Sequence, residues 1–337
     1  MVTQRLPLLN DDYPRIVSVN HLARILGYDI DLIRTVAETA GDFYKPFDQF
    51  KKLDEDGRER WRHIDNPTGV LKDIQRKIQT RILDPIAYRL PDYLSGGMPE
   101  RSTVKNALPH VSKEIVLEMD LEKCYDNISE DQIRRVWIQL GCGREVANIL
   151  TMLTTTGNRL PQGSPASTIL CNLVLAEMAN ELHRNAQRRG MSYTQYIDDA
   201  TISGKAEVVR LYMKEAIGVV QRHGAKLNKS KTELIPRSRG QTVTGVGVNQ
   251  KLAITNRKFQ SIRERIVTIS HPEGPINKKI IQSIWGQIHN AEQIDRKKGK
   301  KLASLARTRL DSLEIFDGPK IKKSPRTREC SSYNQAH

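Results

Sequence analysis

Two adjacent acidic residues interrupt a strand-like stretch of the sequence, "QYIDDATIS" at 195–203. Ile197, Thr201 and Ile202 favour a half-buried strand, whereas aspartate is depleted in strand interiors and adjacent carboxylates repel each other. Two explanations fit Asp198 and Asp199: a solvated hairpin turn, or a bound cation that offsets the repulsion. The pair alone favours the solvated turn.

A third carboxylate ends another strand-like run. Asp120 closes "EIVLEMD" at 114–120, in which apolar and polar residues alternate as in a strand. Magnesium binds through a few oxygen ligands, and aspartates at the ends of neighbouring strands would supply them. In nucleotidyl transfer, one magnesium ion activates the attacking hydroxyl and a second neutralises charge on the triphosphate. These residues therefore suggest a nucleotidyl-transfer site.

The segments around these aspartates alternate between strand and helix. We expect helices at about 130–155, 168–189 and 206–223, a Pro/Gly loop at 159–167, strand–turn–strand at 192–204, and a hairpin at 242–255 with its turn near Asn249–Gln250. Residues 256–315 have a helical and basic pattern. This mixture predicts an α+β fold.

Three segments of the first ninety residues carry further predicted elements. Apolar spacing predicts two short helices within 18–40, broken near Gly27. Residues 50–67 suggest a hairpin that turns at Asp56–Gly57. Residues 70–90 predict an amphipathic helix that Pro85 interrupts.

Bulk composition narrows the class of partner. The 337 residues carry a formal charge of +15, with basic residues throughout, which suits a polyanion such as nucleic acid. The four cysteines lack zinc-site spacing, so we expect reduced thiols and a cytoplasmic protein. We expect no signal peptide or membrane span, because no stretch has about 20 apolar residues.

Four motifs occur in the order typical of reverse transcriptases, over about residues 45–300: "DLEKCYDNI", "LPQGSP", "YIDD" and "LNKSKTELI". The chain resembles that family. The resemblance implies a right-hand polymerase: an N-terminal helical extension at 1–45, fingers at 46–113 with part of the palm, a palm at 114–250 with a fingers insertion at about 130–160, a helical thumb at 251–315, and a basic flexible tail at 316–337.

The resemblance also implies roles for individual residues. Asp120, Asp198 and Asp199, with Leu121, would hold two Mg²⁺ ions, for which Mn²⁺ could substitute. The Tyr125 ring would exclude a ribose 2′-OH and so favour dNTPs, although a core tyrosine is the plainer alternative. The remaining contacts to the nucleotide would come from Arg62, Lys123, Cys124, Gln162, Gly163 and Lys231. A solvated side chain remains the alternative for Lys231, and an ordinary loop before a helix remains the alternative for Gln162 and Gly163.

Two further motifs resemble bacterial retron reverse transcriptases. Asn106-Ala107-x-x-His110 matches NAxxH, and Val243-Thr244-Gly245 matches VTG. Asn106, His110, Thr244 and Gly245 would contact RNA or DNA, although His110 could equally brace the palm and Thr244–Gly245 could be a plain bulge. Further RNA contacts are expected from basic residues at 296–310, namely Arg296, Lys297, Lys298, Lys300 and Lys301, for which a solvated helix face is the alternative.

A retron enzyme would copy its own noncoding RNA. The resemblance implies priming from a guanosine 2′-OH, a branched single-stranded DNA (msDNA) as product, and anti-phage defence with a separately encoded effector protein. Two other functions stay open: another bacterial reverse transcriptase of intron-derived or abortive-infection type, and an inactive nucleic-acid-binding scaffold.

Overall fold

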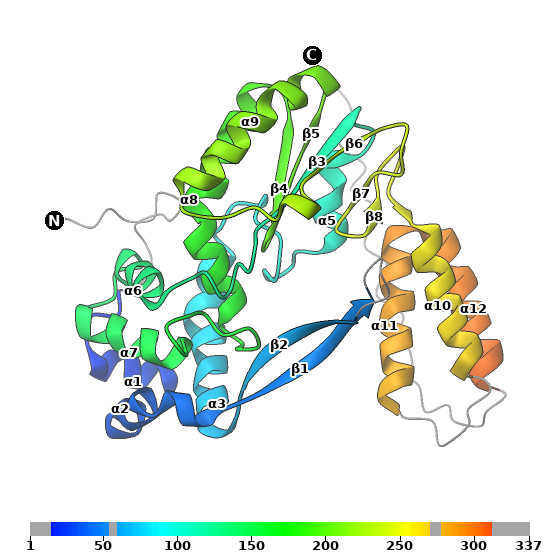
Figure 1. Cartoon of the computed structure of the whole chain (residues 1–337). Helices are drawn as coiled ribbons and strands as arrows, with labels where there is room; N and C mark the ends of the chain where they lie inside the picture. The colour runs from blue at the N-terminus through cyan, green and yellow to red at the C-terminus, as the bar shows by residue number, and fades with distance from the viewer. Residues whose placement is uncertain (1–14, 54–58, 270–277, 312–337) are drawn as a thin grey trace, which may run out of the picture. The chain divides into compact units, whose positions relative to one another are not determined.

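The computed structural model describes residues 15–53, 59–269 and 278–311 (Figure 1). The chain divides into two compact units, Met1–Thr255 and Asn256–His337. Helices and antiparallel sheets are mixed within the first unit, which confirms the expected α+β class. In the described residues, no helix is both long and apolar enough to cross a membrane.

The first unit begins with two short helices, α1 (Val19–Leu26) and α2 (Ile30–Glu38), followed by a 3₁₀ turn at Ala40–Phe43. Gly27 ends α1 in the left-handed conformation, which a glycine adopts without steric penalty. This confirms the break predicted there.

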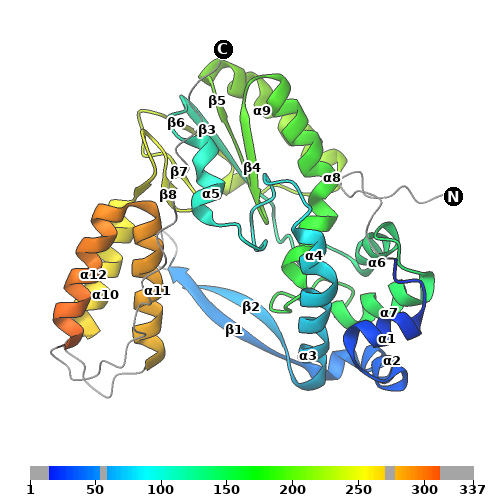
Figure 2. The same cartoon turned by 180° about the vertical axis from the view of Figure 1, so that it is seen from behind.

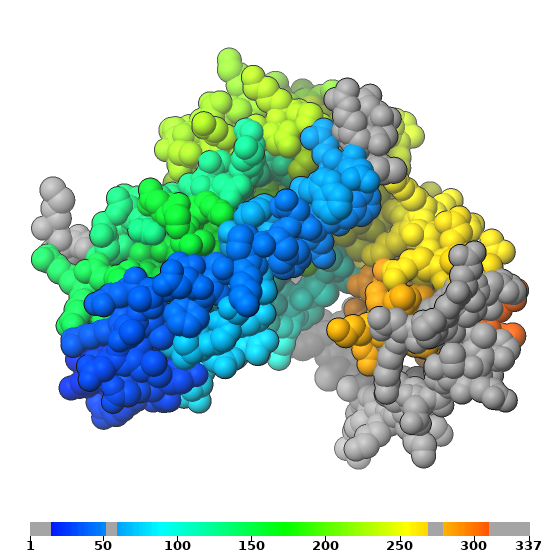
Figure 3. All heavy atoms as spheres, turned by 60° about the horizontal axis from the view of Figure 1, so that its bottom comes forward, coloured from blue at the N-terminus to red at the C-terminus, as the bar shows by residue number. Residues whose placement is uncertain are grey.

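A long hairpin follows, formed by β1 (Tyr44–Leu53) and β2 (Glu59–Pro67). It confirms the predicted hairpin, whereas the predicted turn at Asp56–Gly57 lies outside the described residues. The rings of Phe50 and Trp61 pack edge to face across its strands and remain about half exposed. In Figure 3 the hairpin lies on the surface of the first unit, among the atoms coloured blue.

The next helix does not stop at Pro85, as the sequence had suggested. α3 (Gly69–Ile78) passes through a π-helical turn (Gln79–Leu83) into α4 (Asp84–Ala87). In that turn the Asp84 N–H bonds to the Gln79 carbonyl five residues back. The widened turn lets the helix accommodate a proline that donates no hydrogen bond.

The central sheet has the strand order β4–β5–β3–β6, all antiparallel. Its strands are β3 (Ile115–Asp120), β4 (Ser192–Tyr196), β5 (Asp199–Gly204) and β6 (Glu233–Pro236). Because side chains alternate between the faces of a strand, Leu117 and Ile202 lie on the face packed into the core, while Glu118 and Asp120 lie on the other. The period-2 pattern of "IVLEMD" thus places its aspartate on the polar face.

Helices cover the apolar face of this sheet (Figures 1 and 2). They are α8 (Ser167–Arg188), which packs on β4, and α9 (Ala206–Arg222), which packs on β3 and β5. The helical stretch expected at 130–155 is two helices, α6 (Glu130–Gln139) and α7 (Arg144–Thr154). Gly141, at a φ of 86°, turns the chain between them.

The polar face borders a short helix and a small sheet. The small sheet comprises β7 (Thr242–Val243), β8 (Val246–Gly247) and β9 (Ala253–Ile254). α5 (Thr103–Ala107), which continues into a 3₁₀ turn at Leu108–His110, packs against β4 and this small sheet. A further 3₁₀ turn spans Lys229–Lys231. The sequence predicted one turn in the small sheet; the structure has a second at Thr244–Gly245, whose positive φ angles suit a tight turn.

The second unit contains three described helices, α10 (Asn256–Ile269), α11 (Lys278–Ile294) and α12 (Arg296–Asp311). The three helices pack on one another, and each contributes a buried side chain: Ile266, Ile288 and Leu302. Gly299 allows close approach of α12 to α11, because a methyl group there would lie 2.5 Å from the Glu292 backbone nitrogen. The basic residues 296–310 lie within the single helix α12.

Candidate active site

Three aspartates gather at one end of the central sheet. Asp120, the last residue of β3, lies directly opposite Asp199, the first residue of β5. Asp198 precedes it in the turn from β4, and its carbonyl accepts a hydrogen bond from the Leu121 N–H at 2.9 Å. The structure therefore brings together the aspartates that the sequence singled out.

The turn that carries Asp198 is strained, and contacts from Gln195 and Gly96 hold it in place. Ile197 has a φ of +60°, which is rare for a β-branched residue. The Gln195 amide donates to the Ile197 carbonyl at 2.8 Å. Gly96 packs against this turn so closely that a methyl group there would lie 2.5 Å from the Ile197 nitrogen. Strain of this kind persists where surrounding structure enforces it, and it clusters at functional sites.

Sequence reasoning missed Gly96. The only signal was the pair Gly96–Gly97 in "YLSGGMPE", and nothing local to that pair indicates which strand it approaches. Backbone hydrogen bonds explain the approach: the Ser95 N–H donates to the Gln195 carbonyl, and the Gln195 N–H donates to the Tyr93 carbonyl. These bonds fix residues 93–96 beside the end of β4.

The carboxylates of this site are electrostatically coupled. Desolvation, and then the charges of Asp198 and Asp120, raise the pKa of Asp199 to about 7, even though the residue stays accessible to solvent. Desolvation also raises the pKa of Asp198, with a contribution from Asp120. Lys231 opposes both shifts, and its Nζ lies 2.6 Å from Asp120 Oδ1.

This donor set fits a divalent cation. Carboxylate oxygens are the hard ligands that Mg²⁺ and related ions prefer, and a cation would offset the repulsion among Asp120, Asp198 and Asp199. The ammonium group of Lys231 already occupies one oxygen of Asp120. Within the described residues, no three His, Cys, Asp or Glu side chains are gathered in a metal-binding geometry.

A cavity of about 390 Å³ opens beside the aspartates. Asp120, Asp199 and Lys231 line it together with Thr244 and Gly245 from the turn between β7 and β8. Glu118 also lines it; desolvation, and then the charges of Asp199 and Glu233, raise the pKa of Glu118 to about 7. The structure therefore places part of the VTG motif and two of the three aspartates, Asp120 and Asp199, around one cavity.

A family comparison decides what this site belongs to. The model of the family described as reverse transcriptase (RNA-dependent DNA polymerase) matches residues 50–248, more than half of the chain and all three aspartates. The chain belongs to the reverse transcriptase family. The enzyme is therefore an RNA-directed DNA polymerase, and family membership implies the polymerase fold. Members of this family generally use divalent metal ions, which agrees with the donor set.

Curated relatives narrow the type of reverse transcriptase. Retron Ec86 reverse transcriptase of Escherichia coli is 28% identical over 262 residues, 77% of this chain and 80% of that protein. Retron Se72 reverse transcriptase of Salmonella heidelberg is 27% identical over 322 residues, 91% and 83% respectively. Retron Mx65 reverse transcriptase of Myxococcus xanthus is 33% identical over 229 residues, 61% of this chain and about half (52%) of that protein. These relatives confirm the resemblance to bacterial retron-type enzymes.

The residues expected around the nucleotide lie in three segments of the reverse transcriptase. Arg62 is exposed on β2, and the neighbouring Lys51 has a lowered pKa through desolvation and the charges of Arg62 and Lys231. Lys123 turns the chain after β3 with a φ of +46°. Gly163 packs against the hairpin, because a methyl group there would lie 2.8 Å from the Asp65 carbonyl oxygen.

The side chains after Lys123 are fixed by α8. Cys124 is buried, with its sulfur 3.3 Å from that of Cys171. The Tyr125 hydroxyl lies 3.3 Å from Thr168 Oγ1, and Tyr125 is half-buried. The neighbouring loop is tied to the hairpin through the Gln162 carbonyl, which accepts from the Asp65 N–H at 2.8 Å.

The NAxxH motif of the reverse transcriptase lies beneath the polar face of the sheet. His110 is fully buried, with Nδ1 2.7 Å from Ser203 Oγ and Nε2 2.8 Å from Thr194 Oγ1. Desolvation lowers the pKa of His110 to about 3. Asn106 is also fully buried. Of the two roles left open for His110, these contacts favour bracing the sheet over contacting RNA.

The basic residues expected to contact RNA lie in the second unit, at the start of α12. Arg296, Lys297, Lys300 and Lys301 are exposed. Lys298 is partly buried, and its Nζ lies 3.3 Å from Asn256 Oδ1.

Proposed function

We propose that this reverse transcriptase copies a cognate noncoding RNA, primed from a guanosine 2′-OH of that RNA, into branched single-stranded DNA. The supporting observation is the meeting of the two retron-type motifs beside the aspartates. The Asn106 amide lies 3.5 Å from Thr244 Oγ1, and Thr244 lines the cavity that contains Asp120 and Asp199. The VTG turn, held by the buried Asn106 of the other motif, would thus shape the surface next to the reacting end of the primer.

The proposed catalytic residues are Asp120, Asp198 and Asp199, with Leu121 beside them. Two bound Mg²⁺ ions, or Mn²⁺ in their place, would activate the primer hydroxyl and neutralise charge on the triphosphate. Lys231 balances the charge of Asp120 in the free enzyme. Its ammonium group would then turn to the pyrophosphate as it leaves.

The proposed nucleotide pocket lies between the hairpin and the loop after β3. The Arg62 guanidinium would form two parallel hydrogen bonds to phosphate oxygens. The backbone N–H groups of Lys123 and Cys124 would bind the triphosphate, and Gln162–Gly163 would support the base. The Tyr125 ring would leave no room for a ribose 2′-OH.

In this proposal the polymerase is arranged as a right hand. Fingers with part of the palm comprise residues 46–113, the palm 114–250 with a fingers insertion at about 130–160, and the thumb 251–315, after an N-terminal extension at 1–45. The expected tail, 316–337, lies outside the described residues. The cationic start of α12 would bind phosphates of the cognate RNA. A separately encoded effector protein would complete a cytoplasmic anti-phage system.

To test this proposal, the enzyme is expressed together with the RNA encoded beside its gene. Extracted nucleic acid is treated with RNase, with and without debranching enzyme, and separated on a denaturing gel. We expect a discrete DNA band whose mobility changes on debranching and which is absent from an Asp198→Asn/Asp199→Asn variant. DNA synthesis on added primer–template without a branched product would favour an intron-derived or abortive-infection enzyme. No synthesis in either assay would favour an inactive scaffold.

A further inference from the structure

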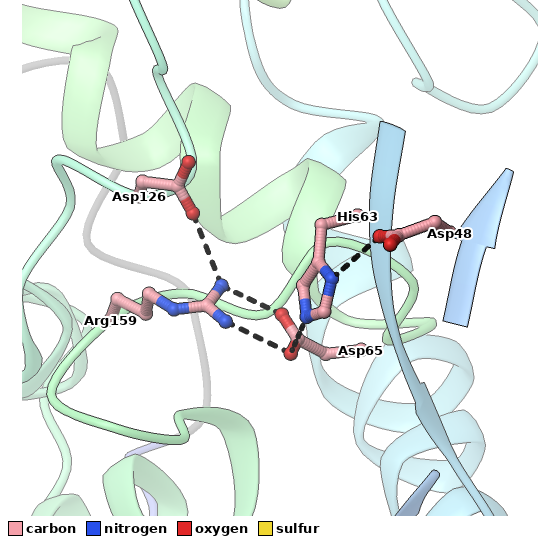
Figure 4. Close-up of polar contacts among 5 residues, drawn as sticks. All are labelled: Asp48, His63, Asp65, Asp126 and Arg159. Atoms are coloured by element: carbon pink, nitrogen blue, oxygen red, sulfur yellow. Dashed lines mark hydrogen bonds and ion pairs between the residues drawn. The ribbon is translucent and has the colours of Figure 1, made fainter. Parts of the chain in front are cut away.

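Arg159 connects three segments of the first unit that are distant in sequence. Figure 4 shows its guanidinium between two carboxylates, that of Asp65 on β2 and that of Asp126 in the loop after β3. Arg159 itself begins the loop that continues into Leu160-Pro161-Gln162-Gly163. Each of the three segments carries residues of the proposed nucleotide pocket.

The contact to Asp65 is a two-pronged ion pair. Nη1 lies 2.7 Å from Asp65 Oδ2, and Nη2 lies 2.9 Å from Asp65 Oδ1. Asp65 is only 5% exposed, so its charge requires a partner with good geometry. His63 Nε2 lies 3.5 Å from the same carboxylate, and His63 Nδ1 lies 2.9 Å from Asp48 Oδ1. The pair is therefore anchored to both strands of the hairpin.

The second contact reaches the loop that follows the first catalytic aspartate. Arg159 Nη1 lies 3.1 Å from Asp126 Oδ1. Asp126 directly follows Tyr125, whose ring is proposed to select the sugar. Because Asp126 is largely exposed, this contact adds little to stability, but it restricts the position of the loop relative to Asp65.

The backbone around Arg159 is itself fixed. Thr156 and Arg159 exchange backbone hydrogen bonds of 3.0 and 3.1 Å across a two-residue turn. The turn residues, Gly157 and Asn158, both have positive φ, as such a turn requires. The side chain of Arg159 therefore extends from a rigid base.

We propose that Arg159 is a positioning residue for the incoming nucleotide. It sets the spacing between the hairpin with Arg62, the loop with Lys123–Tyr125, and the loop with Gln162–Gly163. This assignment rests on the proposed nucleotide pocket. Arg159 does not touch the nucleotide; it acts through Asp65 and Asp126.

The test compares Arg159→Lys and Asp126→Asn with a matched control, Arg34→Lys. Lysine keeps a charge beside Asp65 but has no planar fork with which to bind two carboxylates. Asp126→Asn weakens the contact to the loop alone and leaves Asp65 paired. The control alters an ion pair between Arg34 and Glu145, which joins α2 to α7 and does not line the cavity beside the aspartates.

Steady-state incorporation of a single dNTP on an RNA template gives the main readout. For Arg159→Lys we expect the KM for dNTP to rise by roughly tenfold, because small misplacements of binding groups have effects of that order. We expect kcat and the affinity for primer–template to change little. Asp126→Asn should raise the KM for dNTP less, and the control should behave as wild type.

An unchanged KM for dNTP in both variants overturns the assignment. The assignment is also overturned if Arg159→Lys loses kcat, RNA affinity and melting temperature together while Asp126→Asn behaves like the wild-type enzyme. That pattern would indicate a structural role only. If Arg159→Lys does not fold, Asp126→Asn decides alone. Binding of a fluorescent dNTP analogue is measured in parallel. An inactive wild-type enzyme would count against the proposed function, and the change in analogue binding between wild type and variants would then still support or refute the positioning role.

Discussion

Asp120 and Asp199 oppose each other directly across the ladder between β3 and β5. Like charges in that position destabilise a sheet, typically by a few tenths of a kcal/mol up to about 1 kcal/mol. Such a pair is retained where its charge has a use, and binding of divalent cations is the use that the proposed mechanism assigns to it.

Removing one of these charges should increase the stability of the cation-free protein and weaken its binding of Mg²⁺. We expect Asp199→Asn to raise the melting temperature measured in EDTA, because the repulsion with Asp120 and Asp198 is lost. Added Mg²⁺ should stabilise the wild-type protein and have a smaller effect on the variant. Thermal unfolding with and without Mg²⁺ measures both. A lower melting temperature for the variant in EDTA would show that Asp199 is stabilising as it stands.

Gly96→Ala should damage the active site without touching a proposed catalytic residue. The new methyl group would lie 2.4 Å from Ile197 Cγ1 and 2.5 Å from its nitrogen, so the turn carrying Asp198 must move. We expect a loss in kcat of roughly tenfold or more and a destabilisation of about 1–3 kcal/mol. Gly41→Ala is the matched control, because no atom lies within 4 Å of a methyl group there. Equal activity of the two variants would contradict the close packing described.

Sugar selection should depend on the ring of Tyr125 and not on its hydroxyl. The hydroxyl contacts Thr168 Oγ1, so Tyr125→Phe loses only that contact and should keep its preference for dNTPs over rNTPs. Tyr125→Val removes the ring, and the ratio of kcat/KM for dNTP to that for rNTP should fall by at least roughly tenfold. Similar selectivity in both variants would assign discrimination to another residue.

His110 should make stability depend on pH. Its folded-state pKa of about 3 lies below the value near 6.5 of an unfolded chain. The unfolded state therefore binds a proton between these values that the folded state does not. The contribution of His110 is fully present above about pH 6.5 and is lost as pH falls, by about 1.4 kcal/mol per pH unit. Urea unfolding at pH 7.5 and 5.5 should show a smaller loss for His110→Gln than for wild type; equal losses would contradict the burial of a neutral imidazole.

The sequence was informative where the pattern is local. Alternation in "IVLEMD" placed Asp120 at the end of a strand, and the turn between two strands placed Asp198 and Asp199. Gly27 ended a helix as a C-terminal glycine does. In each case the period of the residues or the backbone freedom of one glycine decides the structure.

Contacts between distant segments could not be derived in the same way. Nothing near Gly96 indicates that Ile197 lies against it, and nothing near Arg159 indicates a partner at Asp65. The prediction that Pro85 interrupts its helix was wrong, because the π-helical turn that accommodates the proline leaves no signal in the pattern of apolar residues. These features follow from tertiary packing, which one sequence does not specify residue by residue.

The most direct measurement is extension of a labelled primer on an RNA template, with Mg²⁺ and dNTPs, by wild type and Asp120→Asn. Glu122→Gln, two residues along and exposed, is the control. We predict extension by wild type and by the control, and a reduction of at least about a hundredfold for Asp120→Asn. Extension by Asp120→Asn at the wild-type rate would contradict the assignment of catalysis to the three aspartates.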